Sequence, residues 1–274
     1  MIDKRFAPEV TQRLFTAVEE DDYVDAQVSL PPVIDLHCTP EIIQGNYALC
    51  LQFWEDGVKR RDLLQLTLKQ AAGRELSEQE RMQYKYMRAR FKHLRFAQRL
   101  YLQRHYAGFI FGKTTVFLGR FQDGFRNQKK DAIAFYGRLL RFYLSAPAWA
   151  MLRYCLRHSR LASVDDFIAY RQGQIRLLKA LVEKPLLTGR EFHDVRKIIS
   201  QQVSYYDTLR SIDPENREAR QVSRFLAAIN GLMGDKHDEM VADDMENRLA
   251  YETPVALDED IRQRLALLLA RFPL

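Results

Sequence analysis

The residues of this chain with the clearest chemical potential form a row of positive charge that contains no acid. Between Glu80 and Asp123 the sequence runs 42 residues without an aspartate or glutamate and carries ten lysines or arginines. Six of these recur every three or four residues, which places them on one stripe of an α-helix. Because like charges at this spacing destabilise an isolated helix, the pattern indicates a site for a polyanion. The stripe consists of Arg81, Lys85, Arg88, Lys92, Arg95 and Arg99.

A linear phosphate chain matches this stripe well. At about 1.5 Å per residue the stripe extends over roughly 27 Å, which suits a flexible polyanion. Arginine forms paired hydrogen bonds to phosphate oxygens, and lysine supplies a mobile point charge. Tyr84, Tyr86 and Tyr101 share this segment, and tyrosines stack on bases, so single-stranded nucleic acid is an alternative ligand. Their place on the apolar arc of the same helix favours a core position instead.

Charge is distributed unevenly along the chain. Residues 1–57 hold eleven acids and three bases, and residues 235–260 hold ten acids and two bases. Residues 58–234 hold 34 bases and 15 acids, a net charge of +19. This distribution predicts an electrostatic binding body. It also supports a second hypothesis, in which the chain is a helical adaptor whose basic stripe docks an acidic protein partner or its own acidic segment.

Catalytic and metal chemistry has little support in the sequence. The Gly-Lys-Thr-Thr segment at 112–115 ends like a phosphate-binding P-loop, but Ala107 stands where that loop needs glycine, and no strand precedes it. Possible metal ligands at 35–38 (Asp-x-His-Cys) and 235–238 (Asp-x-His-Asp) have no second cluster at zinc spacing. No nucleophile motif is present. We predict a protein that is not an enzyme and that uses neither a metal nor a cofactor.

The composition favours a soluble protein of the cytoplasm. No stretch approaches the roughly 18 apolar residues of a membrane span, and the first ten residues lack the apolar core of a secretory signal. The three cysteines, Cys38, Cys50 and Cys155, are odd in number and have no CxxC spacing, which argues against a disulfide framework. The oligomeric state does not follow from the sequence.

Helical signals dominate the chain. Ser77 to Glu80 and Thr188 to Glu191 read as capping boxes, Ser163 opens another helix, and no hairpin signal separates alternating apolar strands. The sequence therefore predicts an all-α protein. We expect helices near 7–19, 39–71, 77–104, 108–124, 129–143, 146–158, 164–184, 189–211, 214–233, 236–250 and 258–272.

The chain also repeats itself at an offset of about 108 residues. Three landmarks recur in the same order, which favours two copies of a unit of about four helices. The paired landmarks are Met87-Arg88 with Val195-Arg196, Phe117-Leu118 with Phe225-Leu226, and Lys129-Lys130-Asp131 with Lys236-His237-Asp238. We predict an N-terminal extension (1–40), a first repeat (41–144), a connecting helix (145–162), and a second repeat with an acidic C-terminal part (163–274).

The segment from Phe192 to Lys197, Phe-His-Asp-Val-Arg-Lys, resembles the opening of the second signature helix of CHAD (conserved histidine α-helical) domains. Its first-repeat counterpart is the segment 85–88, and the segments 225–234 and 236–238 resemble the leucine-rich helix of that family and its Asp-containing turn. Lys85 stands where the first histidine is expected, and Ser200 and Val203 replace usual cations. The resemblance implies two pseudo-symmetric four-helix bundles, a basic surface and binding of inorganic polyphosphate or a similar chain, with association with polyphosphate granules as one use of such binding.

The predicted binding residues extend beyond the stripe. His193 is ambiguous from sequence: it is either a neutral core histidine or an imidazolium that meets phosphate beside two cations. Together with the six stripe residues, the predicted polyphosphate-binding set contains Lys129, Lys130, His193, Arg196 and Lys197.

Overall fold

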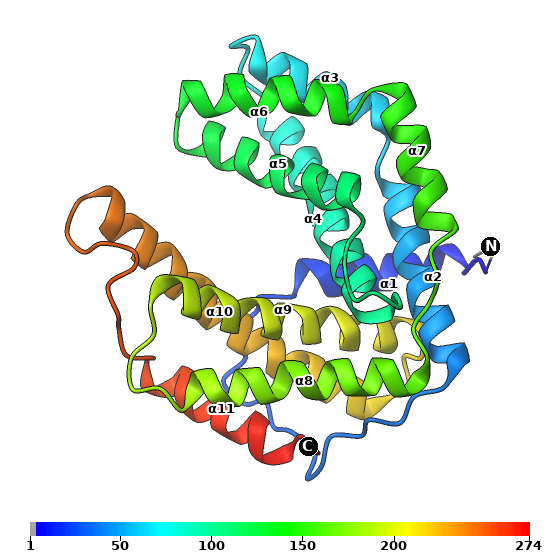
Figure 1. The fold of residues 1–274 in the computed structure, drawn as a ribbon, viewed down its shortest axis with the longest axis vertical. Coiled ribbons are helices and arrows are strands. Elements are labelled where there is room, and N and C mark those ends of the chain that lie inside the picture. Colours follow the sequence, from blue (N-terminus) through cyan, green and yellow to red (C-terminus); the bar gives the residue numbers. More distant parts are fainter. Residues whose placement is uncertain (1–3) are drawn as a thin grey trace. The chain divides into compact units, whose positions relative to one another are not determined.

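A computed structural model describes residues 4–274 as a chain of α-helices (Figure 1). Within this range the β pairing is limited to two isolated bridges, Leu102 with Leu161 and Leu187 with Val255. The prediction of an all-α protein is confirmed. Residues 1–3, which belong to the predicted N-terminal extension and to the segment examined for a secretory signal, lie outside the described residues. The helices are α1 (Pro8–Glu19), α2 (Pro40–Gly57), α3 (Arg60–Ala71), α4 (Glu78–Tyr101), α5 (Phe109–Arg126), α6 (Lys130–Tyr143), α7 (Ala146–Arg157), α8 (Val164–Val182), α9 (Gly189–Ile212), α10 (Arg217–Met245) and α11 (Glu259–Arg271).

The chain divides into two compact units. Unit 1 comprises the described residues up to Ala7 together with Ile43–Ala162, and unit 2 comprises Pro8–Ile42 together with Ser163–Leu274. The segment 145–162, which carries α7, therefore lies in unit 1. Most of the segment 1–40 lies in unit 2, because α1 packs against α9.

The core of unit 1 is aromatic. Trp54 of α2 stacks on Trp149 of α7 with ring centres 5.0 Å apart, and Phe91 of α4 stacks on Phe111 of α5 at 5.1 Å. Helices α5 and α6 form a close pair, and α3 lies against α6. A side chain on Gly137 of α6 would come within 2.9 Å of the Ala71 methyl group, so the glycine permits that approach. These contacts fix α4 and α5 beside each other.

The core of unit 2 is built around α9, which α1, α8 and α10 cover. Its middle is buried and largely polar. The Ser200 hydroxyl donates to Asn230 of α10 at 2.7 Å, and the buried Arg171 of α8 donates to the side chain of Gln202. Buried polar groups require such partners, because an unpaired one costs a few kcal/mol.

Two helix predictions are corrected by the structure. The predicted helix 39–71 is broken after Gly57, where a side chain would collide with Arg90, at 1.9 Å from its Nε atom. The predicted helices 214–233 and 236–250 are parts of one helix, α10, which continues through Gly234. Glycine costs a helix about 1 kcal/mol relative to alanine but does not end it. At Gly234 the missing side chain leaves space for the guanidinium of Arg196, which lies 3.1 Å from the position of a Cβ atom.

The capping signals predicted at three helix starts are confirmed. Both capping boxes form, with the side chains of Ser77 and Thr188 accepting from the N–H groups of Glu80 and Glu191. The side chain of Ser163 caps α8 by accepting from the N–H of Asp166. The position of the basic stripe on α4 therefore follows from a local signal.

Candidate anion-binding site

The basic stripe lies on α4, whose opposite side is buried in unit 1. The apolar side chains of Tyr84, Met87, Phe91 and Leu94 are at most 3% exposed. With those positions fixed in the core, the periodicity of the helix turns the cations away from it. Arg81 and Lys85 are exposed, and the other four stripe residues are half-buried.

The stripe cations have few acidic partners within unit 1. Among the described residues, five of the six form no ion pair with a carboxylate: Arg81, Lys85, Arg88, Arg95 and Arg99. The ammonium of Lys92 lies 5.8 Å from the centre of the Phe96 ring and has other interactions as well. The five cations that form no ion pair with a carboxylate of the described residues attract anions from solution.

Arg88 is held by α5. Its guanidinium donates to the side-chain oxygen of Gln122 at 3.2 Å, and it lies over Gly119, 3.2 Å from the position of a Cβ atom. The absence of a side chain at Gly119 thus gives this arginine a defined place. Arg196 and Gly234 repeat the arrangement in unit 2, where the corresponding distance is 3.1 Å.

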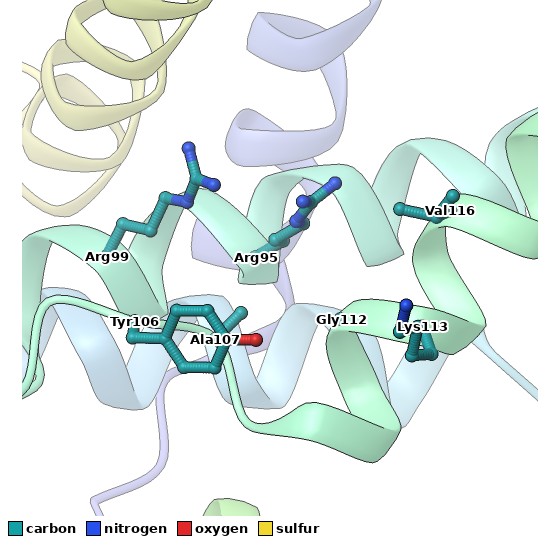
Figure 2. A pocket seen from close by; sticks show the side chains of 7 residues that line it. All are labelled: Arg95, Arg99, Tyr106, Ala107, Gly112, Lys113 and Val116. Carbon is teal, nitrogen blue, oxygen red and sulfur yellow. The ribbon is translucent and has the colours of Figure 1, made fainter.

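Towards the end of α4 the stripe reaches a pocket of about 150 Å³. Figure 2 shows the guanidinium groups of Arg95 and Arg99 extending from the same side of α4, with Lys113 on the facing turn of α5. Tyr106 comes from the loop between the two helices. The remaining lining residues are Ala107, Gly112 and Val116.

The electrostatics of the pocket are unfavourable to its own cations. Burial lowers the pKa of Arg95, the nearby Arg99 lowers it further, and Tyr106 acts in the opposite direction. The Nε atom of Arg95 is buried and has no hydrogen-bond partner among the described residues. An anion in the pocket would supply both an acceptor and opposite charge, so it would relieve both penalties.

The loop that carries Tyr106 is firmly attached to α4. The Nδ1 atom of His105 lies 2.8 Å from the carbonyl oxygen of Arg99, to which it donates. The N–H of Gly108 donates to the side-chain oxygen of Gln98 at 2.9 Å. His105 adopts a left-handed backbone conformation with φ 48°, which this tight return requires. The pocket wall is therefore preorganised.

The P-loop-like segment 112–115 lies inside α5 and not on a loop. The hydroxyls of Thr114 and Thr115 donate to the carbonyls four residues earlier, at 2.8 Å each, so they are engaged by the helix itself. Of the four residues, Gly112 and Lys113 line the pocket, and Lys113 is the exposed one. The predicted binding set does not include Lys113, because no local sequence pattern relates this residue to the stripe.

The tyrosines named as possible base-stacking groups occupy other places. Tyr84 and Tyr101 are at most 1% exposed, and Tyr84 donates to the Leu118 carbonyl at 3.1 Å. The assignment to the core is confirmed for Tyr84 and Tyr101, whereas Tyr86 is half-buried. Two aromatic residues near the pocket are exposed instead: Tyr106 at 59% and Phe109 at 61%, and the ammonium of Lys113 lies 5.7 Å from the Phe109 ring centre.

No family model, no curated protein and no solved structure matches this chain. The resemblance to CHAD domains therefore rests on the residues quoted from the sequence and stays a prediction. The same holds for the two-bundle repeat.

The remaining predicted residues divide between the two units. Lys129 and Lys130 are exposed at the start of α6, and the structure gives them no contact with the pocket. In unit 2, Lys197 is paired with Asp194 at 2.9 Å, so this cation is already neutralised. Arg196 lies over Gly234.

His193 is neutral near pH 7. Burial, together with the nearby Lys197, His237 and Arg196, lowers the pKa of its imidazole to about 4 against the opposing effect of Asp194. The ring lies 5.5 Å from that of His237, centre to centre. Of the two states left open by the sequence, this environment favours the neutral imidazole, although the residue is half-buried and its Nδ1 atom has no hydrogen-bond partner among the described residues.

The described residues contain neither a metal-binding cluster nor a membrane-spanning helix. In residues 4–274 no group of three or more histidine, cysteine, aspartate or glutamate side chains is arranged to hold a metal ion. The Asp35 carboxylate accepts from the N–H of His37 at 2.7 Å, and burial raises the pKa of the Cys38 thiol to about 11. Over the same residues, none of the helices has both the length and the apolar character of a membrane span.

Proposed function

We propose that unit 1 binds inorganic polyphosphate along the basic face of α4 and that it does so without catalysis. The observation that carries the proposal is the set of five α4 cations that form no ion pair with the carboxylates of the described residues. The row spans roughly 27 Å, so several successive phosphates contact it at once. Binding of this kind is dominated by counterion release and weakens steeply with salt.

The test is a titration of long-chain polyphosphate against the protein and against two charge-reversal variants. Arg81→Glu/Lys85→Glu changes two exposed residues of the stripe. Arg217→Glu/Arg220→Glu makes the same change in net charge at the start of α10, on two exposed arginines without ion pairs among the described residues. We expect the α4 variant to bind at least about tenfold more weakly, because each lost charge contact costs about 1 kcal/mol or more.

The control variant separates a specific site from a general effect of net charge. We expect it to bind within about twofold of the unchanged protein. Equal losses in both variants would mean that polyphosphate reads only the net charge, and the proposal would then be wrong. Polyglutamate serves as a competitor that mimics an acidic protein. If the chain is an adaptor for acidic proteins, polyglutamate should displace polyphosphate when both are present at equal concentrations of charge.

Single-stranded RNA is a second candidate, favoured by one observation. Tyr106 and Phe109 are exposed beside the cationic pocket, and stacking of a base on an aromatic ring contributes about 1–3 kcal/mol. Replacement of both aromatics by alanine would then weaken RNA binding strongly and leave polyphosphate binding nearly unchanged. Direct competition between the two ligands ranks them.

A further inference from the structure

The pocket formed by Arg95, Arg99 and Lys113 differs from the rest of the α4 face because it is walled. Tyr106 and Ala107 close one side from the loop, and α5 closes another (Figure 2). Its volume of about 150 Å³ is below the roughly 300–1,000 Å³ of pockets that enclose whole small molecules. It therefore suits a small anionic group and does not suit an extended stretch of chain.

The charge of the pocket selects among such groups. Three cations line it, and no carboxylate does. An internal phosphate of a polyphosphate chain carries a single negative charge. A terminal phosphate group carries about −1.5 to −2 at neutral pH, as a phosphomonoester does, and offers three acceptor oxygens. The larger charge and the extra oxygens of the terminal group match the three cations better.

The backbone adds to this preference. Helix α5 begins next to the pocket at Gly108, whose position as N-cap provides no side-chain hydrogen bond to the first turn. The first N–H groups of a helix lack partners within it and carry partial positive charge, which favours an anion at that end. The N–H of Gly112 is already used by the Gly108 carbonyl at 2.7 Å, so the donors that remain are those of the first turn.

We propose that this pocket binds the terminal phosphate group of the polyphosphate chain, with the rest of the chain extending along α4 towards Arg81. The inference rests on the proposed function, since it names the part of the same ligand that the end of the site holds. It gives the site a polarity: one end recognises a chain end, and the other contacts any internal phosphate.

The experiment measures the affinity of two variants for two ligands and asks whether each variant loses affinity mainly for one of them. The ligands are tripolyphosphate, which is rich in ends, and long-chain polyphosphate whose ends are blocked as phosphoramidates, which removes the second charge of each terminal group. The variants Arg99→Gln/Lys113→Gln and Arg81→Gln/Lys85→Gln each remove two cations and break no ion pair among the described residues. Thermal unfolding of each variant checks that its fold is retained.

We expect Arg99→Gln/Lys113→Gln to bind tripolyphosphate about tenfold or more weakly and to bind the end-blocked chain with a much smaller loss. The Arg81→Gln/Lys85→Gln variant should give the reverse ranking. If end-blocking leaves the affinity of the unchanged protein for long chains the same and the two variants lose tripolyphosphate equally, the inference is wrong while the proposed function stands.

Two further results separate the inference from the function on which it rests. If neither form of long-chain polyphosphate binds, the proposed function itself fails. If only RNA binds and a 5′-phosphate strengthens that binding through Arg99 and Lys113, the pocket recognises a terminal phosphate of RNA, and the assignment to polyphosphate is overturned.

Discussion

Helices α4 and α9 are built alike at their starts and differ along their sides. Each has 24 residues and a capping box whose glutamate pairs with a lysine: Lys69 with Glu80 at 2.6 Å in unit 1, and Lys184 with Glu191 at 2.5 Å in unit 2. Nine residues of α4 are buried, against fifteen of α9, which α1, α8 and α10 cover. The difference in cover explains why only α4 keeps a row of cations.

The covered middle of α9 shows what replaces charge when a helix side is buried. Neutral hydrogen-bonding residues such as Ser200 and Gln202 stand there, each paired across the interface. A cation at such a position would have to lose its water, which costs several kcal/mol unless partners replace that water, as Gln202 and Tyr206 do for the buried Arg171 of α8. On this argument, the cations of α4 are tolerated because their side is open to solvent and to anions.

The largest expected effect comes from giving α9 a cation like those of α4. At the predicted offset of 108 residues, Ser200 of α9 takes the place of Lys92 of α4, and Ser200 is 7% exposed. We expect Ser200→Lys to lower the free energy of unfolding by about 3 kcal/mol or more, because it buries an unpaired ammonium. Ser200→Ala, the control, should cost about 1 kcal/mol. Denaturant unfolding measures both, and equal stabilities would contradict the comparison.

The second largest effect on stability is expected from Asp207, a buried acid of α9. Burial raises the pKa of its carboxyl to about 7, against the opposing effects of Arg210 and Ser223. The folded state therefore holds this proton more tightly than the unfolded state, whose pKa is near 4. The contribution of Asp207 is most favourable below about pH 4 and is lost as pH rises through 7.

Asp207→Asn removes this dependence and keeps an acceptor for the Ser223 hydroxyl, which donates at 2.6 Å. The stability of the variant relative to the unchanged protein should rise by about 1–3 kcal/mol between pH 5 and pH 8. Urea unfolding at several pH values measures it. A constant difference across this range would show that the carboxyl ionises normally.

His193, in the same unit, makes the folding stability depend on pH with the opposite sign. Its folded pKa of about 4 lies below the usual 6.5, because burial favours the neutral ring. Its contribution is fully present above about pH 6.5 and is lost as pH falls towards 4. His193→Gln should therefore lose about 1–2 kcal/mol less stability than the unchanged protein on acidification from pH 7 to pH 4.5. Identical acid sensitivity would refute this reading and would favour an exposed imidazolium.

The smallest effect is expected at the exposed pair of Asp194 and Lys197. The two side chains are 44% and 45% exposed, so the pair contributes less than about 0.5 kcal/mol to stability. Because Lys197 is already neutralised, Lys197→Gln should change polyphosphate affinity by less than about twofold. A loss of polyphosphate affinity as large as that of Arg81→Glu/Lys85→Glu would show that unit 2 takes part in binding.

The features that depend on local sequence signals could be predicted from the sequence alone. The capping box at Ser77 and the three-to-four residue spacing located α4 and its stripe, and both are present in the structure. The pocket was not predictable in this way. Lys113 and Arg99 line the same pocket only because the loop between α4 and α5 turns back through His105 and is paired with the chain at Leu161, about sixty residues away.

Errors in the helix boundaries have the same origin. The apolar pattern of residues 39–71 gives no sign that Arg90, from a different helix, occupies the space beside Gly57. In α10, Gly234 looks like a break in sequence, yet it leaves space for Arg196 within a continuous helix. In both places a glycine leaves space for the side chain of an arginine that is distant in the sequence.

The central claim is that a polyanion binds the five α4 cations that form no ion pair with the carboxylates of the described residues. The salt dependence of polyphosphate binding tests this claim most directly. Kd is measured between about 50 and 200 mM salt for the unchanged protein and for Arg81→Gln/Lys85→Gln. If both residues release counterions on binding, the slope of log Kd against log salt concentration should fall by about 1–2. Slopes that agree within error would show that these cations do not meet the ligand, and the account would be contradicted.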